Sequence, residues 1–181
     1  MRILAAPIAF ALLSGCAATT ASPPSTSPAA TDTYSVREGM VNRINPPATA
    51  MWDLQVEAMD DEGNFDAARM DAATWRSLSQ AARALHSEAQ RMANAQSYSA
   101  ADPDGTLGPA PEGTDLAAIQ TRLTAHEPGY RSFSRAFESQ AADIVRAVEG
   151  RHTQDLTRLV NDMQPTCKSC HDVFWYPEEY E

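Results

Sequence analysis

Cys167, Cys170 and His171 belong to a short motif, CKSCH, whose residue types and spacing could do chemistry. On a helix, positions i, i+3 and i+4 lie on one face. Two thiols on that face can add to the two vinyl groups of one porphyrin, and the imidazole of His171 can then bind the iron as an axial ligand. The spacing therefore predicts a covalently attached haem c.

Three other roles for this motif leave part of it unexplained. A zinc site needs four ligands, and the remaining histidines, His86, His126 and His152, are widely separated along the chain. A thioredoxin-like thiol pair lies at the start of a helix in a βαβ unit, whereas this pair falls late in a predicted helix. A disulfide bond between the cysteines would give His171 no role. Haem attachment remains the prediction.

The predicted helix that carries the motif spans about residues 153 to 175 and has one apolar face. Because the two cysteines continue this face, we expect the haem to be buried among the helices. Pro165 should distort the helix just before the motif. The residues on the apolar face recur at spacings of three and four: Leu156, Val160, Met163, Cys167, Cys170 and Phe174.

The rest of the chain from residue 35 also reads as helix. Its long segments are rich in Ala, Leu, Arg, Glu and Gln, and none shows the sustained alternation of a strand. Within the first helix, Pro46 and Pro47 predict a break or kink near Ile44 and Asn45, with Asn45 as the cap of the part that follows.

The predicted elements form an all-α fold. The main helices are expected over 35–59, 66–95, 130–149 and 153–175, with a long loop over 96–113 and a short extra helix over 115–126. Pro128-Gly129 should stop the extra helix, and Gly150 should cap the third main helix. Mostly short connections favour an antiparallel four-helix bundle with the haem covalently attached on its last helix.

The N-terminus reads as a targeting segment. Residues 1–15 combine a positive start with an apolar stretch too short to span a bilayer, which is typical of a signal peptide. The stretch ends in Leu13-Ser14-Gly15-Cys16, which resembles the lipobox of bacterial lipoproteins and implies cleavage before Cys16 and lipidation of that residue. An ordinary secretory signal with a chance cysteine, or an uncleaved anchor, would be the alternatives.

The segment after the lipidation site is composed of Ala, Thr, Ser and Pro. With almost no charge and no large apolar residue before Tyr34, residues 16–34 are expected to form a flexible tether to a haem domain over 35–181. By analogy with lipoprotein sorting, Ala17 favours the outer membrane, so the domain would face the periplasm. The lipid would be its only membrane contact.

The charge of the chain restricts its partners. It has 14 basic and 24 acidic residues, a formal net charge of −10. This argues against binding nucleic acid or anionic lipid through charge and favours soluble partners with basic patches. Solubility alone would also explain an acidic composition.

From about Ser35 to Trp175, the chain resembles the cytochrome c prime family of bacterial haem proteins. The resemblance rests on CKSCH followed by the aromatic Phe174, on Phe65-Asp66-Ala67-Ala68 opening the second helix, and on the spacing between the third helix and the motif. It implies a four-helix bundle with the haem on its last helix, and dimers are common among relatives, so a homodimer is one expected state. Many relatives have a basic residue where this chain has Trp175.

The same resemblance makes the function depend on the sixth position of the iron. One branch of the family fills it with a methionine of the first helix and carries electrons, whereas another leaves it open behind a bulky apolar residue and binds small gases. Here the first helix offers Met51, our preferred ligand, and Met40, the second choice. Both could instead be core residues that fill space.

Weaker predictions concern the surroundings of the haem. Trp75 and Phe174, with Phe133 and Phe137, are expected at the walls of its pocket, although such aromatics are usually core residues. Arg37 and Arg43 could pair with the haem propionates or be solvated, and His86 is expected at the surface.

The sequence has no carboxylate pair, nucleophile–base arrangement or phosphate loop that would indicate an enzyme. It predicts a lipid-anchored c-type cytochrome that transfers electrons to a redox protein with a basic docking surface. The alternative is a five-coordinate haem protein that binds nitric oxide or carbon monoxide.

Overall fold

A computed structural model of the chain describes residues 32–102 and 104–176. The predicted signal peptide, the lipidation of Cys16 and the tether up to residue 31 lie outside these residues. In the described part, no helix is long and apolar enough to cross a bilayer. The elements are β1 (Thr33–Ser35), α1 (Val36–Gly39), η1 (Met40–Ile44), α2 (Asn45–Ala58), α3 (Ala72–Asn94), β2 (Ser97–Ser99), α4 (Leu116–Ala125), α5 (Glu127–Glu149), α6 (Thr153–Asn161) and α7 (Met163–Phe174).

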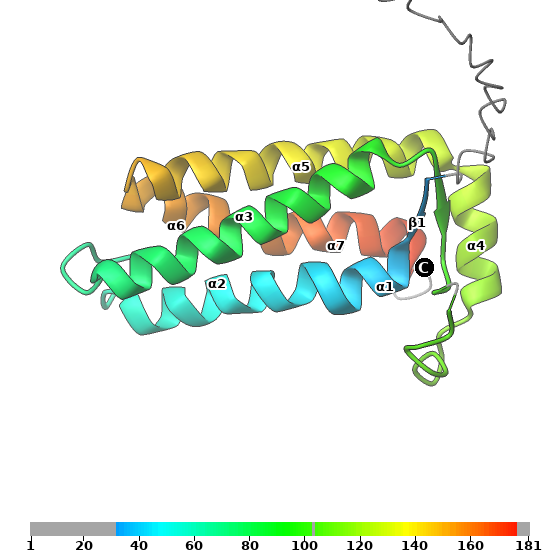
Figure 1. Cartoon of the computed structure of the whole chain (residues 1–181), viewed down its shortest axis with the longest axis horizontal. Helices are drawn as coiled ribbons and strands as arrows, with labels where there is room; N and C mark the ends of the chain where they lie inside the picture. The colour runs from blue at the N-terminus through cyan, green and yellow to red at the C-terminus, as the bar shows by residue number, and fades with distance from the viewer. Residues whose placement is uncertain (1–31, 103, 177–181) are drawn as a thin grey trace, which may run out of the picture. The chain divides into compact units, whose positions relative to one another are not determined.

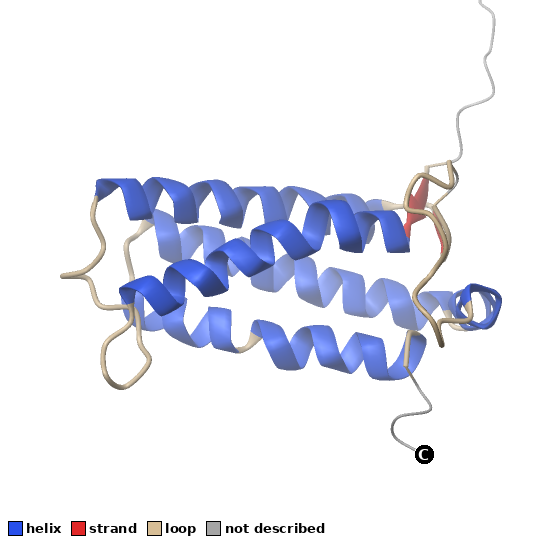
Figure 2. Cartoon of the chain, turned by 90° about the horizontal axis from the view of Figure 1, so that it is seen from below, coloured by secondary structure: helices blue, strands red, loops and turns tan. Residues whose placement is uncertain are grey.

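The described part is mostly helical, as predicted. Helix α3 packs against α2 and α5, α5 packs against α6 and α7, and α6 also contacts α2. Figure 1 shows the chain passing along one axis in α2, returning in α3, and passing again in α5 and in α6 with α7. Figure 2, turned by 90°, shows these helices side by side. Their facing surfaces bury a core that includes Leu78, Leu85, Ile144, Leu156 and Val160.

Two short strands contradict the expectation of a chain without strands. β1 pairs in parallel with β2, with Tyr34 opposite Tyr98. Each strand has three residues and buries only its central tyrosine. Three residues are too few to show alternation, so the sequence pattern could not reveal the pairing. The small sheet fastens the start of the first helix to the segment that leaves α3.

The first helix changes its winding where the prolines were expected to break it. Of the expected break or kink, there is no break: the π-helical segment η1 joins α1 to α2, and the Asn45 N–H donates to the Met40 carbonyl five residues earlier. Pro46 and Pro47 lie in the first turn of α2, where their missing N–H groups are tolerated. The predicted capping role of Asn45 is wrong, because it is the first residue of α2 and no side chain caps that helix.

The second long helix begins later than predicted. Its N-cap is Asp71, whose carboxylate accepts the backbone N–H groups of Ala73 and Thr74. Residues 65–68, which were expected to open the helix, instead lie in the turn before it. Aspartates at both 66 and 71 can cap a helix, and the sequence alone does not distinguish them.

The extra helix and the third main helix follow the prediction closely. α4 begins after the cap Asp115, and Gly150 is the C-cap of α5. Pro128, however, lies in the first turn of α5, which therefore starts at Glu127. In Figure 1, α4 lies across the end of the long helices at which β1 is found.

The last predicted helix is divided. α6 ends at Asn161, Asp162 lies between the two parts, and α7 begins at Met163. Pro165 explains the division, because it has no N–H to donate to the Asn161 carbonyl four residues earlier. The distortion predicted before the motif is therefore present, three residues upstream of the proline itself.

Candidate cofactor-binding site

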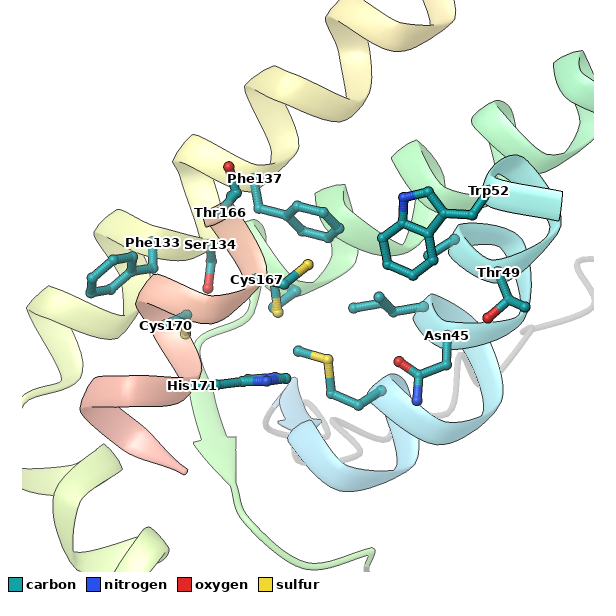
Figure 3. A pocket seen from close by; sticks show the side chains of 14 residues that line it. Asn45, Thr49, Trp52, Phe133, Ser134, Phe137, Thr166, Cys167, Cys170 and His171 are labelled. Carbon is teal, nitrogen blue, oxygen red and sulfur yellow. The ribbon is translucent and has the colours of Figure 1, made fainter. Parts of the chain in front are cut away.

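The CKSCH motif lies on α7 at the wall of a cavity of about 370 Å³. This volume is within the range of about 300–1,000 Å³ that small-molecule and cofactor sites usually have. Figure 3 shows the His171 ring pointing from α7 toward the helix that carries Asn45, Thr49 and Trp52. Cys167 points into the same space.

Four segments besides α7 supply the other walls. Met40 and Ile44 come from η1, and Met92 comes from α3. Together with the aromatic rings, these residues make the cavity mostly apolar. The remaining residues that line it are Asn45, Ala48, Thr49 and Trp52 of α2, Phe133, Ser134 and Phe137 of α5, and Thr166 of α7.

Helix α7 presents the motif to the cavity through its spacing and its anchors. Cys167, Cys170 and His171 are half-buried and border the cavity together, as the helical spacing predicted. At the end of the helix, the buried Phe174 ring packs edge-on against the rings of Tyr130 at 5.2 Å and Phe133 at 6.2 Å. Phe174 thus anchors the end of α7 to α5 and does not line the cavity.

Burial favours the uncharged forms of the two thiols and the imidazole in the motif. Both cysteines are free thiols, with no disulfide bond between them. Burial raises the pKa of the Cys167 thiol, and burial together with Cys167 raises the pKa of the Cys170 thiol to about 12. Burial lowers the pKa of His171, against a smaller opposite effect of Asp172. A neutral imidazole can bind a metal through a ring nitrogen.

A second cavity of about 160 Å³ adjoins the first. Met40, Asn45 and His171 border both cavities, so the two spaces meet between η1 and α7. The second cavity is closed by the loop before α4 and by the end of α7. The other residues that line it are Arg37, Val41, Pro111, Thr114, Trp175 and Tyr176.

The three methionines near the site differ in position. Met40, the second choice from the sequence, borders both cavities. Met51, the first choice, is completely buried in the core and is not among the residues that line either cavity. Met92 was predicted only as a buried residue of its helix, yet it lines the larger cavity, and its sulfur accepts a hydrogen bond from the Tyr130 hydroxyl at 3.4 Å.

The winding of η1 explains this arrangement. The sequence placed Met40 and Met51 on one face because eleven residues correspond to nearly three α-helical turns. A π-helical turn holds one residue more than an α-helical turn, which rotates everything after it by about 100°. The same rotation places Trp52 at the cavity, although the sequence pattern did not single it out. Ile44, which is apolar and lies four residues after Met40, lines the cavity beside it.

The other predicted site residues are divided between the cavity and the rest of the fold. Phe133 and Phe137, expected at the walls of a haem pocket, line this cavity. Trp75 is not among the lining residues, and its ring instead stacks with the guanidinium of Arg151 at 5.6 Å. His86, expected at the surface, is half-buried, with Nε2 3.1 Å from a Glu138 carboxylate oxygen.

The two arginines considered for propionates are engaged within the fold. Arg37 is buried and pairs with Asp102, with its Nη1 3.3 Å from Oδ1. It also donates to the carbonyls of Leu107, Gly108 and Pro109 in the loop before α4. The guanidinium is therefore not solvated, which was one of the two expectations for it. Arg43 is more exposed and pairs with carboxylates of Glu38 and Glu88.

The described residues contain no group of three or more His, Cys, Asp or Glu side chains that could hold a metal ion by themselves. The chain matches no protein-family profile, no curated protein and no solved structure.

Proposed function

We propose that this domain is a c-type cytochrome, an antiparallel four-helix bundle of α2, α3, α5 and α6 with α7. Haem c would be held by thioether bonds to Cys167 and Cys170, with His171 as an axial ligand of the iron. The observation that carries the proposal is that both thiols and the imidazole border one mostly apolar cavity.

The donor set fits this group. Both cysteines are free, and their raised pKa values keep them as thiols. When a thiol adds to a vinyl group, its sulfur bonds to one carbon and its hydrogen is transferred to the other. The lowered pKa of His171 favours the neutral imidazole that binds iron. The cavity of 370 Å³ and its 160 Å³ neighbour meet at His171, which would allow a flat group to extend into both.

Bound haem supplies one-electron redox chemistry to the protein. The chain would determine the polarity and the axial ligands of the site. Apolar side chains such as Ile44 and Phe137 exclude water, and His171 is held by its place on α7. Met40 borders the cavity as well, and a thioether ligand raises the reduction potential and blocks exogenous ligands. These features support an electron carrier.

One observation favours the second candidate, a gas-binding protein. Met40 borders both cavities, so its sulfur could lie on the side of the second cavity and leave the iron facing Ile44 and Ala48. An open position among apolar side chains would admit nitric oxide or carbon monoxide. In either case we propose the cellular setting that the sequence predicts: a bacterial lipoprotein facing the periplasm, with a redox partner that carries basic residues and a homodimer as one expected state.

The test of attachment is simple. Haem should stay on the purified protein through acid–acetone extraction and on denaturing gels. Changing Cys167 and Cys170 together to Ser should abolish retention, whereas Ser169→Ala, between them, should keep it. Haem that washes out of the unmodified protein would contradict the proposal. The spectrum of the reduced protein then separates a low-spin carrier from a high-spin gas binder.

A further inference from the structure

The π-helical segment η1 supplies Met40 and Ile44 to the cavity. Pro46 and Pro47 follow it after Asn45, and neither has an N–H to donate to the η1 carbonyls of Asn42 and Arg43, four residues earlier. π-Helical turns are rare and are frequently found at functional sites. Side chains that hold η1 from outside would therefore help to fix the position of Met40.

Glu88 of α3 is the side chain placed to do this. Its side chain is only 5% exposed, and Oε1 lies 3.1 Å from Nε of Arg43, the fourth residue of η1. Its other oxygen, Oε2, accepts a hydrogen bond from Arg91 at 2.9 Å. The contact with Arg43 is ionic, because neither atom of that pair has a hydrogen bond. A buried carboxylate thus connects the middle of η1 to a long, regular helix.

The surroundings of Glu88 extend this anchor toward Met40. Arg43 also pairs with Glu38 of α1, so its guanidinium joins the helical segments on both sides of Met40 to α3. Tyr34 packs on Gly39, the residue before Met40, so closely that a Cβ on Gly39 would overlap its hydroxyl. Burial and the charge of Glu88 raise the pKa of that hydroxyl, which places it in the same cluster.

Glu88 is also close to the cavity along its own helix. Met92, four residues later and so on the same face of α3, lines the cavity. We infer that Glu88 is a positioning residue, which holds η1 against α3 and thereby keeps the Met40 side chain at the iron-facing wall of the cavity. The effect of Glu88 on iron ligation rests on the proposed haem site, whereas its anchoring of η1 can be measured by amide exchange alone.

The test compares Glu88→Gln with the unmodified haem protein. Glutamine keeps the shape of the side chain and removes its charge, so the ionic contact with Arg43 is lost. Backbone amide exchange over residues 40–45 should become at least tenfold faster. The near-infrared band of methionine ligation should weaken, and carbon monoxide should bind the reduced protein faster. Arg43→Gln, at a more exposed position, should give the same changes, and combining it with Glu88→Gln should add little.

Glu138→Gln is the matched control. Glu138 is a partly buried carboxylate that pairs with His86 between α3 and α5, away from η1. It should leave exchange over 40–45 unchanged. If Glu88→Gln also leaves that exchange unchanged, the positioning role is refuted. A wild-type spectrum without methionine ligation would instead contradict the carrier proposal, and amide exchange would still decide whether Glu88 anchors η1.

Discussion

Alanine at Met51 and alanine at Met40 should affect different properties of the protein. Met51 is completely buried in the core, so its removal deletes a full set of packing contacts and leaves a void. Replacement of a buried methionine by alanine costs about 2–5 kcal/mol, which corresponds to roughly 5–15 °C in Tm for a domain of this size. Met40 is half-buried and already borders cavities, so its replacement should cost only about 1 kcal/mol.

The optical spectrum should change more in Met40→Ala than in Met51→Ala, which is the reverse of their effects on stability. If the Met40 sulfur binds iron, Met40→Ala should turn the iron high-spin, lower its reduction potential and let carbon monoxide bind quickly. Met51→Ala should keep the low-spin spectrum, because its side chain does not line the cavity. Met40→Leu keeps the size of the side chain and removes its sulfur, so it separates ligation from packing. Thermal unfolding followed by circular dichroism, and spectra of both oxidation states, provide the two measurements.

Two results would refute this reasoning. A Met51→Ala protein that becomes high-spin with nearly unchanged stability would restore Met51 as the ligand, as the sequence alone suggested. Low-spin spectra in both variants would move the ligand to another residue, with Met92 next because it also lines the cavity. A wild-type protein that is already high-spin would favour the gas-binding proposal.

Two further predictions concern stability. In the apoprotein, the folded state keeps the Cys170 proton until its pKa of about 12, whereas the unfolded state loses it above 9. The free energy of unfolding should therefore fall as pH rises through this interval, with Cys170 contributing up to about 1.4 kcal/mol per pH unit. The fall should be smaller in the haem protein, whose sulfurs cannot titrate, and the part that remains should come from the buried hydroxyls of Tyr34 and Tyr130, whose pKa values are also raised by burial. Arg37→Ala should lower the free energy of unfolding in denaturant by roughly 3 kcal/mol, because it leaves the buried Asp102 carboxylate without its cationic partner. Arg83→Ala breaks only the exposed pair with Glu149 and should cost under about 1 kcal/mol. Equal losses in the two variants would contradict this distinction.

The sequence predicted best where periodic patterns were long. α5 follows from apolar residues at spacings of three and four over more than five turns, and its capping glycine is at the expected place. The arrangement of Cys167, Cys170 and His171 at one wall followed from the same rule applied over five residues. In both cases, local helical geometry alone determines which side chains share a face.

Prediction failed where distant contacts decide between equal local signals. Asp66 and Asp71 are both suitable N-caps, and α3 uses Asp71. Phe65 remains in the preceding turn, where its backbone N–H donates to the Thr157 hydroxyl at 2.9 Å. The parallel pairing of β1 with β2 joins segments 64 residues apart. The extra residue in η1 matters most, because it rotates Met51 away from the cavity. Pro46 and Pro47 indicated an irregularity at this place, but no local pattern shows that it is a π-helical turn.

The buried face of the last helix changes character where the site begins. Leu156, Val160 and Met163 are fully buried, whereas Cys167 and Cys170, which continue the same face, are only half-buried. The contacts that these two side chains lack correspond to the cavity of 370 Å³. The exposed residues Asn45 and Thr49 also line this cavity, so it is accessible from the surface between α2 and α7. The proposed haem, attached to both thiols, would fill this space and continue the apolar face that Leu156, Val160 and Met163 begin.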